Sequence, residues 1–282
     1  MTSSTLALDQ QSSAGSRIKT IAQYELTRLF STKRGWMALT AFSLVWYFIL
    51  RYPINFASSI IARPELSNLL GQVFGMVGVE SLLNWSVPEL AVYWVVSLFL
   101  YPIFSLLITS DQISSDCARG TLRFLVLRST RFELFLGRYL GQLFILFLLV
   151  LATLFATSLM AIYSGQTLDI AFVQHFGFVL LHLFIVLAPV VAVTALTSVV
   201  CQSARSATFL AIIGIGGSMI LVGVIAHYLP QLNVLSDILL GAQVRALATS
   251  SGVESLSHII LPLSQSFVLL AFALFLFKRR AL

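Results

Sequence analysis

The stretch YLGQLFILFLLVLATLFATSLMAIY, residues 139–163, contains no Asp, Glu, Lys or Arg. A transmembrane helix needs roughly 20 mainly apolar residues to cross about 30 Å of hydrocarbon. A membrane-spanning β-strand would alternate apolar and polar residues, whereas this run is almost continuously apolar. The stretch therefore predicts a helix that crosses a membrane.

The composition of the whole chain agrees with this prediction. Of its 282 residues, 58% are hydrophobic and 10% are charged; soluble domains have about 45–50% and roughly 25%. The mean hydropathy is +0.94. We therefore expect an all-α integral membrane protein with six transmembrane helices. The six apolar runs are residues 36–50 (or 36–54), 90–109, 139–163, 170–200, 206–228 and 259–277.

The distribution of cations predicts the side of the membrane on which each loop lies, because Lys and Arg concentrate in short cytoplasmic loops. With a cytoplasmic N-terminus, fourteen of the 17 Lys and Arg residues lie inside, and only Arg51, Arg63 and Arg245 lie outside. Both termini are therefore expected in the cytoplasm. We expect residues 66–85 to form an external or re-entrant helix, because a seventh span would place the arginine-rich loop outside.

The N-terminal region divides into a polar tail and an amphipathic segment. Residues 1–16 are rich in Ser and Gln and lack the pattern of a cleavable signal peptide, so we expect a disordered tail and a retained first span. Residues 17–34 place apolar side chains at helical spacing among cations, which predicts a helix in the membrane interface. An ordinary juxtamembrane anchor is equally compatible with this pattern. Residues 17–282 are predicted to form one domain.

The loop between the second and third spans is unusually basic, with five arginines in residues 119–138. Gly120 and Thr121 precede LRFLVLR, residues 122–128. This run is too short to span, and too apolar to lie in water without a partner. It predicts a short cytoplasmic helix with an apolar body and a basic rim. Such a helix suits a groove on a soluble partner and anionic headgroups equally well.

Two further patterns lead from this loop into the third span. Thr130 and Glu133 fit a capping box, so a new helix should begin near Arg131 and continue into the membrane. Gly137 and Gly141 form a small-xxx-small pattern, which permits another helix to approach closely.

The order of residues through this loop resembles the signature of permeases of the type-two ABC exporter class. In that family an acidic residue precedes Gly-Thr-Leu, and the loop contains a coupling helix that sits in a cleft of the ATPase subunit. Residues 17–34 resemble the family's N-terminal elbow helix. Arg128 stands where the family usually has proline, and Arg138 replaces its lysine. The matching residues are Asp116, Gly120-Thr121-Leu122, Leu125, Thr130-Arg131 and Gly137-Arg138.

The resemblance implies a non-catalytic permease subunit in a bacterial inner membrane. ATP and Mg would be held by two copies of a separate ABC ATPase subunit, and a second permease copy or a homologue would complete the complex. The implied ATPase interface comprises Arg119, Gly120, Thr121, Leu122, Arg123, Phe124, Leu125, Leu127, Arg128, Thr130 and Arg131.

The fifth apolar run has a face of small residues, spaced four, three and four apart: Ala207, Ala211, Gly214 and Ser218. Such a face permits tight helix packing, either within the subunit or across a dimer. Because small residues are common in membrane helices, packing within the subunit is the first expectation.

Several kinds of chemistry find no support in the sequence. It has no Gly-x4-Gly-Lys-Ser/Thr phosphate loop, no His-Glu-x2-His motif and no His/Cys cluster with metal-ligand spacing. The middles of the predicted spans hold no charged residue, which disfavours ion-coupled transport. His182 is expected to be hydrogen-bonded to a neighbouring helix, and Cys117 and Cys201 are expected to be reduced. No nucleic-acid partner is expected.

The sequence favours no single class of cargo. An uncharged pathway suits lipids, hydrophobic peptides or amphipathic drugs. Some permeases of this type are associated with copper-enzyme maturation, but this chain has only five Met and no Met or His-Cys ladder. The alternative function is a non-transporting membrane anchor or scaffold whose basic loop binds anionic lipid or a soluble partner.

Overall fold

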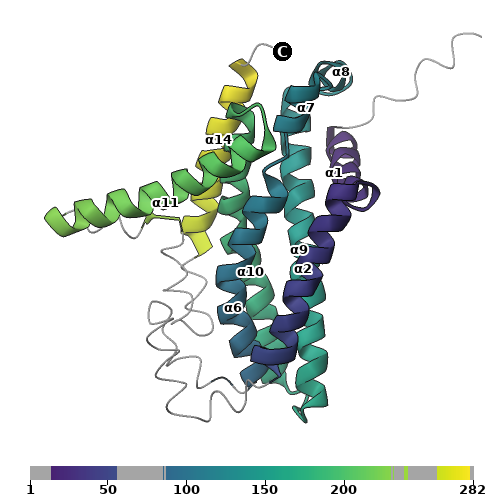
Figure 1. Cartoon of the computed structure of the whole chain (residues 1–282), viewed down its shortest axis with the longest axis vertical. Helices are drawn as coiled ribbons and strands as arrows, with labels where there is room; N and C mark the ends of the chain where they lie inside the picture. Colours follow the sequence, from purple (N-terminus) through teal and green to yellow (C-terminus); the bar gives the residue numbers. More distant parts are fainter. Residues whose placement is uncertain are drawn as a thin grey trace, which may run out of the picture.

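The computed structural model describes residues 14–55, 85, 87–229, 231, 238–240 and 259–279. Within these residues, all regular secondary structure is helical, as predicted (Figure 1). The helices are α1 (Ala14–Ser31), α2 (Lys33–Ile49), the π-helix η1 (Leu50–Ile54), α6 (Pro88–Thr109), α7 (Ser114–Arg119), α8 (Leu122–Val126), α9 (Arg131–Tyr163), α10 (Ile170–Val200), α11 (Ala204–Tyr228) and α14 (Ile260–Arg279).

Among the described residues, six helical stretches are long and apolar enough to cross a membrane, and each overlaps one predicted run. The six predicted runs are therefore confirmed as helices of sufficient length and apolarity. The stretches are Gly35–Ile54, Pro88–Arg119, Arg131–Tyr163, Ile170–Val200, Ala204–Tyr228 and Ile260–Arg279.

Three sequence predictions concern segments at the margins of the described residues. The helix expected at residues 66–85 lies outside them except for Trp85, and residues 1–13 lie outside them as well. The predicted amphipathic helix exists as α1, but it begins at Ala14 and ends at Ser31. Residues 14–16 are therefore helical and do not belong to the predicted tail.

The centre of the bundle is built by α6, α9 and α10, which pack on one another (Figure 1). α14 packs against α10, and α1 packs against α9. Tyr93 and Tyr101 of α6 are fully buried in this core. Their hydroxyl oxygens lie 2.9 and 2.6 Å from Oγ1 of Thr153 in α9, so these buried polar atoms have partners in an apolar setting.

α1 lies close to α9 because two glycines of α9 leave room for it. A Cβ built on Gly137 would lie 2.8 Å from the Cβ of Ile21, and one on Gly141 would lie 3.0 Å from the Cβ of Glu25. Any larger residue would have to push α1 away. The small-xxx-small prediction is confirmed, and its partner is the amphipathic helix α1.

A tight turn connects α1 to α2. Thr32 caps α2, since its Oγ1 accepts a hydrogen bond from the backbone N–H of Gly35 at 3.1 Å. The indole Nε1 of Trp36 donates to the backbone carbonyl of Phe30 at 2.8 Å. A Cβ at Gly35 would overlap the backbone of Leu29, so glycine is required at this position.

α11 extends away from the other helices over most of its length (Figure 1). Ala207 and Ala211, near its beginning, are fully buried against the rest of the chain. Gly214 is exposed, and no described atom lies within 4 Å of where its Cβ would be. The predicted small-residue face is thus divided: its first half packs against the bundle, and Gly214 does not.

Candidate functional site

The arginine-rich loop folds into two short helices at one end of the bundle, α7 and α8 (Figure 1). Gly120 separates them and adopts the left-handed backbone conformation, with φ of 68°. Its N–H donates to the carbonyl of Cys117 at 3.2 Å, which ends α7. A residue with a Cβ is disfavoured in this conformation, so Gly120 lets the chain reverse and start α8.

α8 packs on the bundle through Leu122 and, in part, Val126, and presents its other side chains outward. Leu122 is 1% exposed and joins the core of the bundle. Phe124 and Leu127, by contrast, are 72% and 83% exposed, and Leu125 is also exposed. Large apolar side chains gathered with exposed arginines are typical of a surface that meets another molecule. The exposed arginines of this segment are Arg123 and Arg128.

The helix after α8 begins as predicted. Thr130 Oγ1 accepts from the backbone N–H of Glu133 at 3.2 Å, and the Glu133 carboxylate accepts from the backbone N–H of Thr130 at 2.9 Å. This reciprocal pair is a capping box, so that prediction is confirmed. Glu133 also forms an ion pair with Arg17 of α1 at 2.7 Å.

Arg131 fixes the beginning of α9 to the end of α14. Its Nη1 donates to the backbone carbonyls of Phe277 and Lys278 at 3.0 and 2.7 Å. These carbonyls belong to the last turn of α14, where a cation compensates the partial negative charge of the helix end. The chain directly after α8 is therefore held by α1 on one side and α14 on the other.

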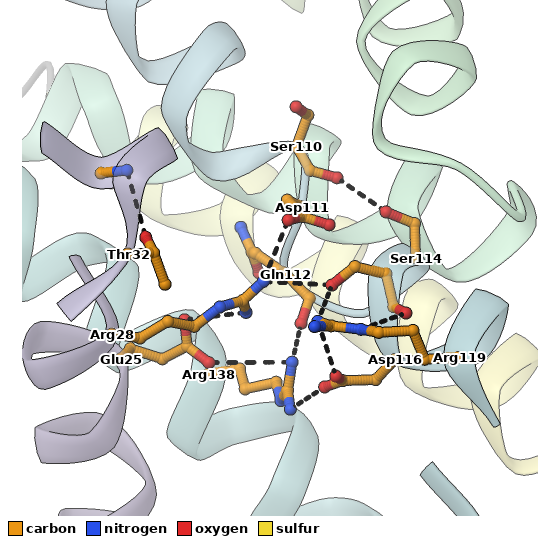
Figure 2. A network of polar contacts seen from close by, with 12 residues as sticks. Glu25, Arg28, Thr32, Ser110, Asp111, Gln112, Ser114, Asp116, Arg119 and Arg138 are labelled. Carbon is orange, nitrogen blue, oxygen red and sulfur yellow. Dashed lines mark hydrogen bonds and ion pairs between the residues drawn. The ribbon is translucent and has the colours of Figure 1, made fainter. Parts of the chain in front are cut away.

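A buried arginine lies beneath these short helices (Figure 2). Arg138 of α9 is 3% exposed, and one guanidinium nitrogen forms an ion pair with Oδ2 of Asp116 in α7. The other donates to the backbone carbonyl of Gln112 and lies 3.7 Å from Oε1 of Glu25 in α1. Gln142 of α9 donates to Oε2 of the same Glu25 at 2.9 Å. One guanidinium therefore connects α1, α9 and the segment from residue 112 to 116.

Arg28 and Arg119 extend this network toward the surface (Figure 2). Arg28 pairs with Asp111 at 2.9 Å and lies 3.6 Å from Glu25. Arg119 pairs with Asp116 at 3.4 Å. Three carboxylates thus alternate with three arginines, and the cluster is electrically balanced.

Among these carboxylates, Glu25 has a raised pKa. Burial raises its pKa above the ordinary value of 4.5, while the Arg138 and Arg28 guanidinium groups lower it only in part. Asp116 acts in the same direction as burial, because a second negative charge lies near the same arginine. The neutral form of Glu25 is therefore more favourable in the folded chain than in a solvated one.

Glu25 was not predicted as a site residue, and Asp116 and Arg138 were predicted only as positions of the family signature. The sequence nevertheless contains a pattern that indicates a buried acid at Glu25. Glu25 follows Ile18, Ile21 and Ala22 on one helical face, so it is the acid on the apolar side of α1. An acid on a buried face needs a cationic or hydrogen-bonding partner on the helix opposite.

Thr121 supports the ion-pair network beneath α8, because its hydroxyl donates to Oδ1 of Asp116 at 3.1 Å. His182 Nδ1 lies 2.8 Å from the carbonyl of Phe178, one turn earlier in its own helix, and the two rings stack at 4.0 Å between centroids. The His182 ring also packs edge-to-face on Trp94 of the neighbouring helix α6. Within the described residues, no group of His, Cys, Asp and Glu could hold a metal ion.

Comparisons of this chain with models of known protein families and with curated protein sequences give no match.

Proposed function

We propose that the chain is the permease subunit of an ATP-driven exporter of the type-two ABC class. In this proposal, α8 is the coupling helix on which a separate ATPase subunit docks. The observation that supports it best is the exposure of Phe124 and Leu125 of α8, and of its C-cap Leu127, between two membrane spans. The resemblance of residues 116–138 to the signature of that family adds independent support.

The chemistry of α8 suits a protein groove. Its three exposed apolar side chains would be buried by a partner, at about 25 cal/mol for each Å² of apolar surface removed from water. Arg123 and Arg128 flank them and would pair with acidic groups at the rim of the groove. Leu122 lies in the protein's own core, so we assign the docking contact to the other three apolar residues.

The ion pairs under α8 supply a route by which docking would affect the membrane helices. A displacement of α7 and α8 would act on Arg138 through Asp116, and on α1 through Glu25. Arg131 would pass the same displacement to the end of α14. The ATPase shifts the permease between two conformations only if it binds α8 with different affinity in its two nucleotide states.

A second permease copy is part of this proposal. Beyond Ala211, α11 presents Gly214 and exposed apolar residues such as Ile213 and Ile220 without cover from the described residues. Membrane helices associate through small residues that allow close approach. We therefore assign the second half of the small-residue face, Gly214 and Ser218, to the contact between two copies.

The direct test is co-purification with an ATPase encoded beside this chain. The tagged permease and the ATPase are expressed together, isolated in detergent and assayed for ATP hydrolysis. We expect a stable complex that Leu127→Asp disrupts, because a carboxylate would then be buried in the groove. Tyr163→Asp is the matched control: Tyr163 is also highly exposed, but it ends the long helix α9 at the other extremity of that span.

The proposal is contradicted if wild type and Leu127→Asp recover equal amounts of the ATPase while both proteins are monodisperse.

The alternative function, a scaffold whose basic loop binds anionic lipid, rests on the exposure of Arg119, Arg123 and Arg128. It predicts binding to anionic vesicles that weakens with salt, and no ATPase partner. The same preparations distinguish the two functions.

A further inference from the structure

An open cleft of about 910 Å³ lies beside the ion-pair network, on a different surface from α8. Its walls come from the α1–α2 turn, the end of α6, α7, α9 and the beginning of α11. No residue from 121 to 128 lines it. Arg119 is the one residue that the cleft shares with the implied ATPase interface, and the apolar docking residues of α8 lie outside it.

Three arginines from three different helices face this cleft: Arg28 of α1, Arg119 of α7 and Arg205 of α11. Glu25 and Asp111 are its acidic lining residues. The lining therefore has one cation more than it has carboxylates. A cleft with a net positive charge and several hydroxyl groups favours an anion that accepts hydrogen bonds. The hydroxyl groups belong to Thr32, Ser110, Ser115 and Ser203.

Arg205 is the surplus cation. Arg28 is held by Asp111 and Arg119 by Asp116, whereas Arg205 forms no ion pair or side-chain hydrogen bond with any residue that the structure describes. It stands in the first turn of α11, whose N-cap is Ser203. The N-terminal end of a helix adds a partial positive charge at the same place. Arg205 is thus ready for a ligand, and Arg119 can join it because its side chain stays 60% exposed beside its ion pair with Asp116.

The rest of the lining is apolar and continues onto a surface that the bundle leaves open. Leu29, Ala38, Leu107 and Ile108 line the cleft, and Leu107 is strongly exposed on α6 close to the end of that span. Hydroxyls and arginines gather where α6 ends, and apolar side chains follow along the span. A phospholipid has the same order: a charged headgroup, then acyl chains.

We infer that this cleft binds the phosphate of an anionic phospholipid, with Arg205 and Arg119 contacting the headgroup and the apolar wall contacting the first part of an acyl chain. Arg28 remains with Asp111 and shapes the floor. Bound there, the lipid would connect the base of α11 to α7, and so would support a helix that otherwise leaves the bundle. The inference does not depend on the proposed ATPase contact.

The test uses the full chain in an uncharged detergent, with its melting temperature followed by tryptophan fluorescence. Short-chain phosphatidylglycerol, phosphatidylcholine and inorganic phosphate are titrated separately. We expect saturable stabilisation by phosphatidylglycerol, a much weaker effect of phosphatidylcholine and none from inorganic phosphate. Arg205→Gln should weaken the phosphatidylglycerol midpoint about tenfold, the effect of losing one charged hydrogen-bonding group.

Arg51→Gln is the matched control, because it removes an exposed arginine of η1 outside the cleft and should leave the midpoint unchanged. Arg205→Lys keeps the charge and should recover most of the binding. Equal midpoints for Arg205→Gln and Arg51→Gln would overturn the inference, as would saturation by inorganic phosphate alone or equal stabilisation by phosphatidylcholine. Arg205→Gln should still co-purify with the ATPase, so the failure of this inference and that of the proposed function are distinguishable.

Discussion

Arg138 of α9 and Asp116 of α7 form an ion pair in which the side chains are only 3% and 11% exposed. This pair ties the short helices at the end of the bundle to a membrane span. Arg138 also reaches Glu25 of α1, so two carboxylates lie around one guanidinium. Their surroundings differ, and the expected effects of removing them differ as well.

Asp116→Asn should strongly destabilise the chain. It removes the charge that pairs most closely with a buried arginine, and breaking a buried pair from one side typically costs about 3–5 kcal/mol. The measurement is the melting temperature in detergent. Asp169→Asn is the control, since Asp169 is exposed and bonds to its neighbour Thr167. Equal melting temperatures for the two variants would show that Arg138 does not depend on Asp116.

Glu25→Gln should behave in the opposite way. Burial raises the pKa of Glu25 above 4.5, so the folded chain binds this proton more tightly than the unfolded chain does. Its contribution to stability is therefore complete below pH 4.5 and is lost as the pH rises through the folded-state value. Because glutamine mimics the neutral form, the two proteins should melt alike below pH 4.5, and Glu25→Gln should melt higher at neutral pH. A lower melting temperature at neutral pH would mean that the ion pairs with Arg138 and Arg28 outweigh burial.

Gly137→Ala should loosen the contact between α1 and α9. The new methyl group would meet Ile21 at 2.8 Å, and overpacking of this kind costs typically about 1–3 kcal/mol. Gly177→Ala in α10 is the matched control because nothing lies within 4 Å of its Cβ position. It should be neutral or slightly stabilising, since glycine inside a helix is less favourable than alanine by roughly 0.5–1 kcal/mol. Thermal unfolding of both variants checks the prediction, and equal losses would contradict it.

Substitutions along the small-residue face of α11 should separate folding from self-association. Ala211 is fully buried, so Ala211→Leu should lower the melting temperature by overpacking. Gly214 is open, so Gly214→Leu should leave the melting temperature of the single chain unchanged and reduce the dimer fraction in light scattering after gel filtration. If both variants lowered the melting temperature equally, Gly214 would belong to an internal contact.

Much of the secondary structure followed from local patterns. The six apolar runs, the capping box at Thr130 and Glu133, and the close-approach pattern at Gly137 and Gly141 were all predicted from spacing alone. The capping box depends on contacts within a few residues, the spans on the length needed to cross hydrocarbon, and the glycine pair on helical spacing, and all three are visible in the sequence. The end of α1 was misplaced by three residues because Thr32, which caps α2, interrupts an otherwise continuous amphipathic pattern.

The partners of these elements could not be obtained in this way. Six apolar runs, a basic loop and a glycine pair can all be read from the order of residues. The packing of the helices is what brings α1 onto the glycine pair, Arg138 between Asp116 and Glu25, and Arg205 to a cleft with Arg28 and Arg119. These relationships join residues as many as 177 positions apart. Helical periodicity specifies which face a residue occupies, whereas the neighbour on that face is set by how the helices pack.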